Sequence, residues 1–507
     1  MKVLYACTEL YPLLKTGGLA DVGAALPAAL QKLGCDVRLI LPAFPAIVKG
    51  VQVDGPPVRL PMEGAPEVLK SSASEPTLLP GYVIASGQRV YLLDAPTLFQ
   101  REGGPYQDAS GNDWPDNAAR FASLCWAAAG LGLGCDTIWS PDIVHAHDWH
   151  TGLIPVYLQC MAQGRQRPAC VFTVHNLAYQ GLFPADVLSA LGLPESLYRW
   201  DGIEFHGQLS FMKAGLQFAD AISTVSPRYA REIMTLEQGC GLEGVLQYRA
   251  NDVLGILNGV DYAIWDPAND PLIDAPYEQN NLAGKLETKR QLQRALGLEA
   301  RPDALLFAAV SRLSEQKGLH LIAGVLDELV ARGGQLIVLG SGDAAIEASL
   351  RSGIERHPTQ AVLQVGYDEV LAHRIMAAAD VVMVPSRFEP CGLTQLYALR
   401  YGALPLVRGV GGLADTVTDS TPQALTDGVA SGFVFQEFSS EALSVAMQRA
   451  FALKQRAQDW TRVQRHAMQL RFDWQDAARS YQTLYKKLSK QVSKKVSSHV
   501  SSTTVPF

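Results

Sequence analysis

The sequence predicts an α/β protein with two doubly wound domains, and three observations support this fold class. The chain has 507 residues, which is enough for two or three domains. Hydrophobic residues make up 48% of the chain, so large buried cores can form. Short, continuously apolar runs alternate with segments of helical periodicity along most of the length. This alternation is typical of parallel sheets that are covered by helices on both faces.

The expected strands fall into two series, one in each half of the chain. The first series comprises residues 2–7, 37–41, 82–85, 90–93, 143–146, 171–174 and 221–225. The second comprises residues 305–310, 335–339, 362–365, 381–384, 404–407 and 432–435. Each series suffices for one Rossmann-like half. The break is expected between Asn251 and Pro302, where Asn258–Asp261 and several prolines interrupt the pattern.

The expected domains are therefore an N-terminal one at 1–255 and a C-terminal one at 256–472. A helix at 473–485 is expected to cross back to the first domain. Residues 486–507 are rich in Lys and Ser and lack a sustained apolar face, so we expect disorder there. Residues 50–80 are expected to form an insertion at the surface, and residues 98–116 are expected to form a long loop near one end of a sheet.

Composition excludes several classes of protein. The net charge of −7 gives no support for a nucleic-acid or anionic-membrane partner. The eight cysteines contain no C-x-x-C pair, which argues against a metal knuckle or a disulfide framework. Glu9 interrupts the short apolar run at the N-terminus, and no stretch approaches the length of a membrane span. These features predict a soluble cytoplasmic protein.

The first candidate site is Lys15-Thr16-Gly17-Gly18-Leu19-Ala20-Asp21-Val22, between the first strand and a helix. Glycines at such a junction let backbone N–H groups approach an anion at the start of the helix, and Lys15 adds a positive charge. The string is neither a Walker loop nor G-x-G-x-x-G. A simple tight turn is the structural alternative.

The second candidate is His145-Ala146-His147-Asp148-Trp149-His150, directly after a buried strand. Three histidines and an aspartate raise a zinc hypothesis, but alternation along a strand points His147 and Asp148 to opposite faces. A sugar-binding strand end fits better. Thr173-Val174-His175-Asn176 ends the next strand and is expected to face the same crevice.

Two further candidates follow strands of the second half. Ser311–Gly318 contains Arg312 and Lys317, a planar fork and a point charge that could stabilise a departing diphosphate. Pro385–Gln395 contains Glu389, which could accept hydrogen bonds from sugar hydroxyls beside a helix start. Gly409–Asp415 is another glycine-rich turn. Five polar strand ends spread over both halves favour one cleft between the domains.

These strings resemble the bacterial glycogen synthase and plant starch synthase family, from Met1 to about Tyr485. The resemblance implies the B-type glycosyltransferase fold, with two Rossmann-like domains facing a deep cleft. It also implies glucosyl transfer from ADP-glucose to the non-reducing end of an α-1,4-glucan with retention of configuration. No metal or other cofactor is implied, and neither nucleic acid nor a membrane is an expected partner.

Residue roles follow from the same resemblance. Glu389, His175, Asp148, Lys317 and Arg312 would be catalytic: Arg312 and Lys317 would clamp the diphosphate, Glu389 would hold glucosyl hydroxyls, His175 would approach the glucosyl unit, and Asp148 would shape the reaction centre. The expected substrate-binding residues are Lys15, Gly17, Gly18, Asp21, Tyr106, Asn258, Tyr367, Cys391, Gly392, Leu393 and Thr394. Many retaining relatives of this fold carry a second glutamate eight residues after the first, where this chain has Tyr397.

Two other classes stay open on sequence grounds. A nucleotide-sugar epimerase or a phosphorylase could share the two-domain fold, and a phosphorylase would need a lysine for its pyridoxal group. A non-catalytic sugar-binding protein is the second alternative, although it has no need for Arg312 and Lys317 beside Glu389.

Overall fold

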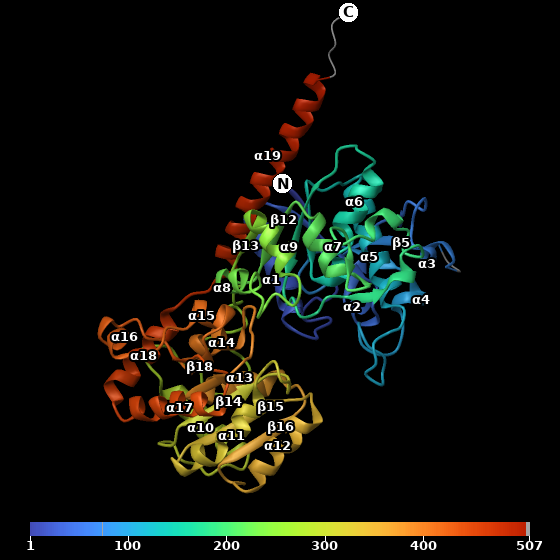
Figure 1. The fold of residues 1–507 in the computed structure, drawn as a ribbon. Coiled ribbons are helices and arrows are strands. Elements are labelled where there is room, and N and C mark those ends of the chain that lie inside the picture. The colour runs from blue at the N-terminus through green and yellow to red at the C-terminus, as the bar shows by residue number, and fades with distance from the viewer. Residues whose placement is uncertain (73–74, 503–507) are drawn as a thin grey trace, which may run out of the picture. The chain divides into compact units, whose positions relative to one another are not determined.

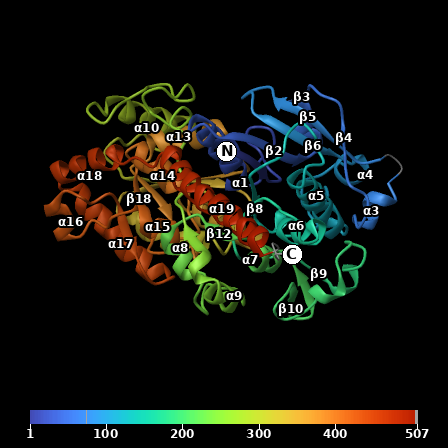
Figure 2. The ribbon, with the colours of Figure 1, turned by 90° about the horizontal axis from the view of Figure 1, so that it is seen from above.

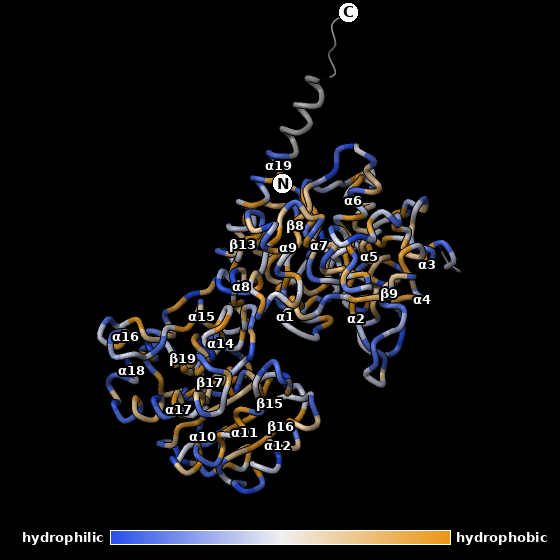
Figure 3. The backbone as a smooth tube through the Cα atoms, in the orientation of Figure 1, coloured by the Kyte–Doolittle hydropathy of each residue, from blue (hydrophilic) through white to orange (hydrophobic). Residues whose placement is uncertain are grey.

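The computed structural model describes residues 1–72 and 75–502, with side chains described as far as Gln491. The chain forms two compact units (Figure 1). The first contains residues 1–225 and 230–256 and the chain from Trp474 onward, and the second contains residues 226–229 and 257–473. Hydrophobic segments gather in the interior of each unit (Figure 3). The predicted pair of doubly wound α/β domains is confirmed.

The first unit is built on a ten-stranded sheet with the order β13-β12-β8-β7-β1-β2-β6-β5-β3 and β4 paired to β5. Its parallel strands are β1 (Lys2–Ala6), β2 (Asp36–Pro42), β6 (Arg89–Asp94), β7 (Ile143–His147), β8 (Ala169–Val174), β12 (Ala221–Thr224) and β13 (Val253–Gly255). From the adjacent strands β1 and β7, the chain adds β2 and β6 on one side of the sheet and β8, β12 and β13 on the other. This pair is therefore the topological switch point, where open α/β sheets bind ligands.

The segment at 50–80 is more ordered than the sequence suggested. It contains β3 (Val51–Val53), β4 (Val58–Arg59), the short helix α3 (Glu67–Lys70) and most of β5 (Thr77–Val83). Both β3 and β4 pair with β5, which itself runs antiparallel to β6. The excursion therefore extends one edge of the sheet, a pairing that short and interrupted apolar patterns do not reveal.

Helices cover both faces of this sheet. The connection from β1 to β2 and that from β7 to β8 run in opposite directions of the sheet order, so right-handed crossovers place α1 and α6 on opposite faces. The helices of this unit are α1 (Gly18–Lys32), α2 (Pro45–Lys49), α4 (Pro96–Phe99), α5 (Asn117–Gly132), α6 (Ile154–Ala162), α7 (Phe211–Phe218), α9 (Glu243–Tyr248) and α19 (Trp474–Ser502), with α8 (Pro227–Glu232) at the boundary. A small sheet of β9 (Leu182–Pro184), β10 (Glu204–Phe205) and β11 (Gln208–Ser210) lies beyond α6 in sequence.

Helix α19 packs along α1 and β8, and Figures 1 and 2 show it beside α1. The side-chain amide of Gln482 donates to the Leu33 carbonyl at 2.9 Å, and the hydroxyl of Tyr485 lies 2.7 Å from Nδ1 of His145. Disorder was expected from Lys486 onward, but the helix continues to Ser502. Once packing has nucleated a helix, each added residue costs little, so Lys- and Ser-rich sequence can extend it. Residues 503–507 lie outside the described residues.

The second unit has a six-stranded parallel sheet with the order β16-β15-β14-β17-β18-β19. The strands are β14 (Leu306–Val310), β15 (Gln335–Gly340), β16 (Ala361–Val365), β17 (Val381–Val384), β18 (Leu404–Arg408) and β19 (Phe433–Phe435). Here the order reverses between β14 and β17, so the switch point lies between these strands. All six were expected from the apolar runs, because strands buried on both faces have to be continuously apolar.

The helices of the second unit are α10 (Ala283–Ala295), α11 (Leu319–Ala331), α12 (Ala344–Glu355), α13 (Glu369–Ala378), α14 (Thr394–Arg400), α15 (Gly411–Thr416), α16 (Pro422–Asp427), α17 (Ser440–Lys454) and α18 (Ala457–Gln469). Helix α11 packs on α12 and α17, whereas α10 packs on α13, and α14 packs on α18. One continuous hydrophobic core joins these helices to the sheet. The remaining single-turn 3-10 helices of the chain are Trp149–Thr151, Ala185–Val187, Glu195–Leu197 and Ala250–Asp252.

Candidate functional site

At the switch point of the first unit, Glu9 organises the loop that follows β1. This buried carboxylate accepts hydrogen bonds from the amide and the hydroxyl of Thr16, each at 2.6 Å, and from the Gly17 amide at 3.3 Å. The hydroxyl of Tyr106 also donates to it at 2.6 Å. Glu9 therefore ties the glycine loop to the 98–116 loop. The backbone amides of Thr16 and Gly17, in the loop that was expected to bind an anion, thus already donate to the carboxylate of Glu9.

Lys15 and Asp21 form an ion pair beside this loop, with Nζ and Oδ1 3.0 Å apart. The Lys15 ammonium also lies 5.3 Å from the centre of the Tyr11 ring. These two contacts hold the Lys15 ammonium in place. Gly17 and Gly18 are exposed at the start of α1, and among the described residues an added Cβ at Gly17 would meet no atom within 4 Å. The loop is thus open to a ligand on that side.

Asp148 follows β7 with a backbone φ of 60°, a strained conformation for a non-glycine residue. Its carboxylate accepts hydrogen bonds from the amides of His175 at 2.8 Å and Asn176 at 3.3 Å. Burial nevertheless raises the pKa of Asp148 to about 7, because removal from water disfavours the charged form. Asp148 thus fixes the backbone after β8 and orients His175.

His175 and the histidines of β7 form a connected group. Nε2 of His175 lies 2.9 Å from Nδ1 of His147, and Nε2 of His145 lies 2.6 Å from the Thr173 hydroxyl. Burial lowers the pKa of His175 to about 3, so its imidazole is neutral at physiological pH. A neutral imidazole can donate or accept a hydrogen bond with a sugar hydroxyl. His150 instead stacks on Tyr106, with ring centres 4.5 Å apart.

In the second unit, Lys317 and Glu389 meet across the switch point. Lys317 lies in the loop after β14 and Glu389 in the loop after β17, and their Nζ and Oε2 atoms are 2.6 Å apart. The Ser386 hydroxyl donates to the same oxygen of Glu389 at 2.8 Å. Glu389 is buried and Lys317 is about one fifth exposed at its side chain, so the pair lies at the protein surface with one face accessible.

Backbone contacts hold three strand-end loops together around Glu389. The Arg387 amide donates to the Gln316 carbonyl at 2.8 Å, and the Gly412 amide donates to the Glu389 carbonyl at 3.1 Å. A Cβ added at Gly411 would lie 1.9 Å from the Glu389 carbonyl oxygen, and one at Gly412 would lie 2.1 Å from that of Cys391. The predicted glycine turn at 409–415 therefore packs directly against the Glu389 loop.

The residues that follow Glu389 in sequence, together with Asn258, lie close to it. The thiol of Cys391 is buried beside the backbone of Asn258, and burial raises the pKa of this thiol to about 12. Gly392 has a φ of 73°, and its carbonyl accepts from the Gln395 side chain at 2.9 Å. Leu393 and Thr394 are half-buried at the start of α14. Asn258, Cys391 and Gly392 thus form one group with Glu389.

Two other expected residues are more exposed. Arg312 immediately follows Ser311 at the end of β14 and is exposed, in the same loop as Lys317. Tyr367 follows the edge strand β16, and 67% of its surface is exposed. Because β16 is separated from β14 by β15, Tyr367 lies two strands away from the loop of Lys317.

Tyr397, at the position where relatives carry a second glutamate, is half-buried and packs against the core of its unit. Its ring stacks on Trp265, with ring centres 3.9 Å apart and an interplanar angle of 4°. This contact gives Tyr397 a packing role within α14.

Glu9 and Ser386 are polar groups of these sites that the sequence reasoning did not select. Both lie two or three residues after the end of a strand and contact a residue that was selected. The strand-end rule that found Asp148 and Glu389 could have found them as well. Among the side chains of residues 1–72 and 75–491, no group of three or more His, Cys, Asp or Glu is arranged to hold a metal ion. Every helix described in residues 1–72 and 75–502 is too short or too polar to span a lipid bilayer.

Comparisons with known proteins agree with this division of the chain. Residues 2–248 match the family model of the starch synthase catalytic domain, and residues 296–466 match that of the group 1 glycosyl transferases. Fold and sites together define a glycosyltransferase with two Rossmann-like domains.

Comparison with individual proteins identifies the family within this class. The chain is 55% identical to the glycogen synthase of Albidiferax ferrireducens, covering 96% of this chain and 99% of the relative, and 51% identical to that of Francisella tularensis subsp. novicida, with the same coverage. Among solved structures, the catalytic domain of starch synthase IV from Arabidopsis thaliana, bound to ADP and acarbose, matches with a TM-score of 0.85 and 32% identity over 96% of this chain and 99% of that one. The chain belongs to the glycogen and starch synthase family, as its motifs predicted.

Proposed function

We propose that this protein extends α-1,4-glucans by transferring glucose from ADP-glucose to their non-reducing ends, with retention of configuration and release of ADP. The observation that carries the proposal is the Lys317–Glu389 pair, which spans the switch point of the second unit at 2.6 Å. Support for the donor and acceptor comes from the glycogen synthases that share half of this sequence and from the ADP-bound starch synthase of similar fold.

In this proposal the second unit holds the nucleotide sugar. Arg312 and Lys317 neutralise the diphosphate as the bond between it and the glucosyl carbon breaks. Glu389 accepts hydrogen bonds from glucosyl hydroxyls, beside the group formed by Cys391, Gly392, Leu393 and Thr394 and the nearby Asn258. Tyr367 is a candidate neighbour of the adenine ring.

The first unit supplies the rest of the proposed reaction centre. His175, neutral because of its burial, hydrogen-bonds a glucosyl hydroxyl, and Asp148 positions it through the backbone amide. Lys15, Gly17, Gly18, Asp21 and Tyr106 contact the donor from the loops that Glu9 joins. Both sets of residues have to approach one glucosyl group, because reacting atoms must come within about 3–3.5 Å of each other.

Retention is proposed to proceed on a single face of the sugar. The acceptor hydroxyl forms the new bond to the glucosyl carbon, its proton passes to the departing phosphate, and ADP leaves with the electron pair of the broken bond. Retaining glycosidases instead use two carboxylates about 5–5.5 Å apart, one of them as nucleophile. Tyr397 occupies the place of a second carboxylate, so Glu389 acts here by positioning and charge. Mass spectrometry of the reacting enzyme should detect no glucosyl adduct on Glu389.

The proposal also places the enzyme in the cytoplasm, where its eight cysteines stay reduced. It requires no metal or other cofactor, so full activity is expected after treatment with EDTA. Loss of activity that zinc restores would instead revive the hypothesis of a metal at the histidine group.

Incubation of the purified protein with different donors tests the proposal against the alternative classes. ADP-glucose with glycogen should release ADP, and omission of glycogen should stop the release. A phosphorylase would instead release glucose 1-phosphate from glycogen and phosphate, an epimerase would convert the nucleotide sugar without an acceptor, and a sugar-binding protein would turn over none of these. Any of these three results would contradict the proposal.

A further inference from the structure

The second unit contains a cavity of about 340 Å³ at the end of its sheet opposite to the Lys317–Glu389 pair. Its floor is Asp380, which directly precedes β17, whereas Glu389 follows the other end of this strand. Helix α10 forms one wall, and the end of α17 together with α18 forms the other. The cavity therefore lies at the amino end of β17 and is separate from the site described above.

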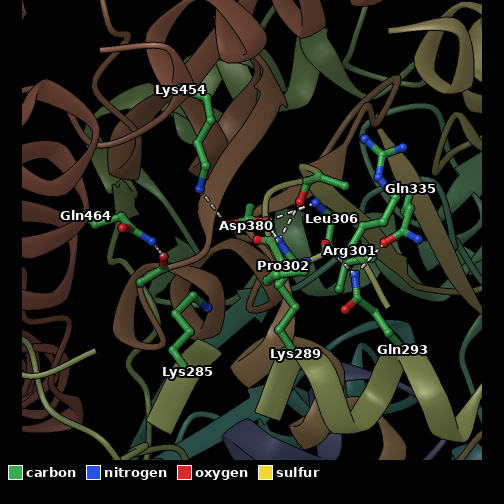
Figure 4. Close-up of polar contacts among 12 residues, drawn as sticks. Lys285, Lys289, Gln293, Arg301, Pro302, Leu306, Gln335, Asp380, Lys454 and Gln464 are labelled. Carbon is green, nitrogen blue, oxygen red and sulfur yellow. Dashed lines mark hydrogen bonds and ion pairs between the residues drawn. The ribbon is translucent and has the colours of Figure 1, made fainter. Parts of the chain in front are cut away.

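Positive charge dominates this cavity. Lys285 and Lys289 project from the same face of α10, and Lys454 comes from the opposite wall toward Asp380 (Figure 4). Asp380 is the sole carboxylate among the described lining residues, and it pairs with Lys289 at 2.6 Å and with Lys454 at 3.1 Å. Arg465 adds a further cation at the exposed rim. One carboxylate cannot balance these cations.

Lys285 is the buried cation of this group that lacks a carboxylate partner among the described residues. Its buried ammonium donates to the carbonyls of Ala377 at 3.0 Å and Tyr401 at 3.1 Å, but it pairs with no carboxylate in the described part of the chain. The two carbonyls take up two of the three donors of this ammonium, which also lies 5.7 Å from the centre of the Tyr277 ring. Burial, with the nearby charges of Lys289 and Lys454, lowers the pKa of Lys285 to about 7. An anion beside it would relieve this cost.

Trp460 on α18 lines the same wall as Lys454, whose Nζ lies 4.6 Å from the centre of the indole ring. Only 3% of its surface is exposed, and its indole Nε1 has no hydrogen-bond partner among the described residues. The cavity therefore has cations on both walls, Lys285 and Lys289 on α10 and Lys454 and Arg465 opposite, which a ligand with several acceptor oxygens could contact.

We propose that this cavity binds a small dianion of the phosphate-monoester class. A phosphate group offers several acceptor oxygens in different directions, which suits donors that come from opposite walls. It also carries nearly two negative charges at neutral pH, matching the excess of cations better than a single carboxylate does. The half-buried Thr461 and the exposed Leu286 at the rim leave room for an organic portion, and the volume is at the lower end for small-molecule sites.

The test is a titration of the ¹⁵N-labelled full-length protein with inorganic phosphate and with glycerol 3-phosphate, at constant ionic strength and with saturating ADP to fill the diphosphate site. The indole signal of Trp460, assigned by its absence from Trp460→Phe, should shift saturably with a Kd in the range of about 0.1–10 mM. Acetate at the same ionic strength should not shift it.

Variants locate the binding and provide a matched control. Lys454→Gln and Arg465→Gln should each weaken phosphate binding about 3- to 10-fold. Arg290→Gln removes an exposed cation from α10 outside the cavity and should leave binding unchanged. If phosphate produces no saturable shift up to about 50 mM, if acetate acts equally, or if Lys454→Gln and Arg465→Gln bind as the unmodified protein does, the proposal is wrong.

Discussion

At the scale of single residues, the account depends most on the contact between Lys317 and Glu389. Since the two groups meet at 2.6 Å, each should lose much of its effect when the other is removed. Lys317→Met and Glu389→Gln should each lower kcat about 10²- to 10³-fold. The kcat of the double variant should be no lower than that of the less active single variant. Steady-state kinetics of all four proteins measure this coupling, and losses that multiply would show that the residues act independently.

The buried histidines of the first unit predict a loss of stability in acid. Burial lowers the pKa of His150 to about 3 and holds the pKa values of His145 and His147 well below 6.5. Below pH 6.5 these histidines become protonated in the unfolded chain but stay neutral in the folded protein. The free energy of unfolding therefore falls as the pH falls. Each histidine contributes a slope of up to roughly 1.4 kcal/mol per pH unit. The raised pKa of Asp148 has the opposite effect, because the folded protein binds a proton at this carboxyl at a higher pH than the unfolded chain does.

Hydrogen exchange can detect this effect within one unit. Peptides that cover β7 should lose protection between pH 7 and pH 5, after correction for the intrinsic pH dependence of exchange. Peptides that cover β15, in the second unit, provide the internal control. Equal protection of β7 at both pH values would show that the histidines can be protonated in place.

At the scale of elements, the start of α15 is packed too closely for any side chain. A Cβ at Gly412 would lie 2.1 Å from the Cys391 carbonyl oxygen, so Gly412→Ala should displace the loop of Glu389. A displacement of about 1 Å commonly costs on the order of 10² in rate. Gly244→Ala is the matched control, because in the described structure an added Cβ there meets no atom within 4 Å. Transfer rates of the two variants test the prediction, and a fully active Gly412→Ala protein would refute it.

Helix α19 should contribute strongly to the stability of the first unit. Tyr481 is buried, with 2% of its surface exposed, and its ring lies 5.0 Å from that of His145. Tyr481→Ala should lower the free energy of unfolding by about 3–5 kcal/mol. Tyr248→Ala, at a position that is 83% exposed, should change it by less than about 0.5 kcal/mol. The urea concentration at which α1 peptides lose protection reports the difference, and similar values for both variants would contradict it.

The sequence predicted elements better than it predicted contacts. Strands buried on both faces were visible as apolar runs, and the polar residues after them marked both switch points. The antiparallel edge formed by β3, β4 and β5 was not visible, because its pairing depends on neighbours rather than on pattern. The partner of Thr16 and Gly17 proved to be Glu9, a carboxylate from the same strand end. The lysine-rich cavity joins residues more than 90 positions apart, which no local motif records.

At the scale of the whole molecule, the chain leaves the first unit near Ile256 and returns to it at Trp474. The candidate residues are divided accordingly, with Lys15, Asp148 and His175 in one unit and Arg312, Lys317 and Glu389 in the other. The central claim is that both sets serve one transfer of glucose to a glucan. Neither unit contains the whole proposed set, so each should be necessary.

The most direct measurement is the incorporation of labelled glucose from ADP-glucose into glycogen by the intact protein and four variants. The intact protein should incorporate label, and Lys15→Ala and Lys317→Ala should each lower the rate by about 10² or more. The exposed positions Lys49 and Arg351 provide one control in each unit, and their alanine variants should keep the full rate. A folded intact protein that incorporates no label, or a Lys15→Ala or Lys317→Ala variant with an undiminished rate, would contradict the account.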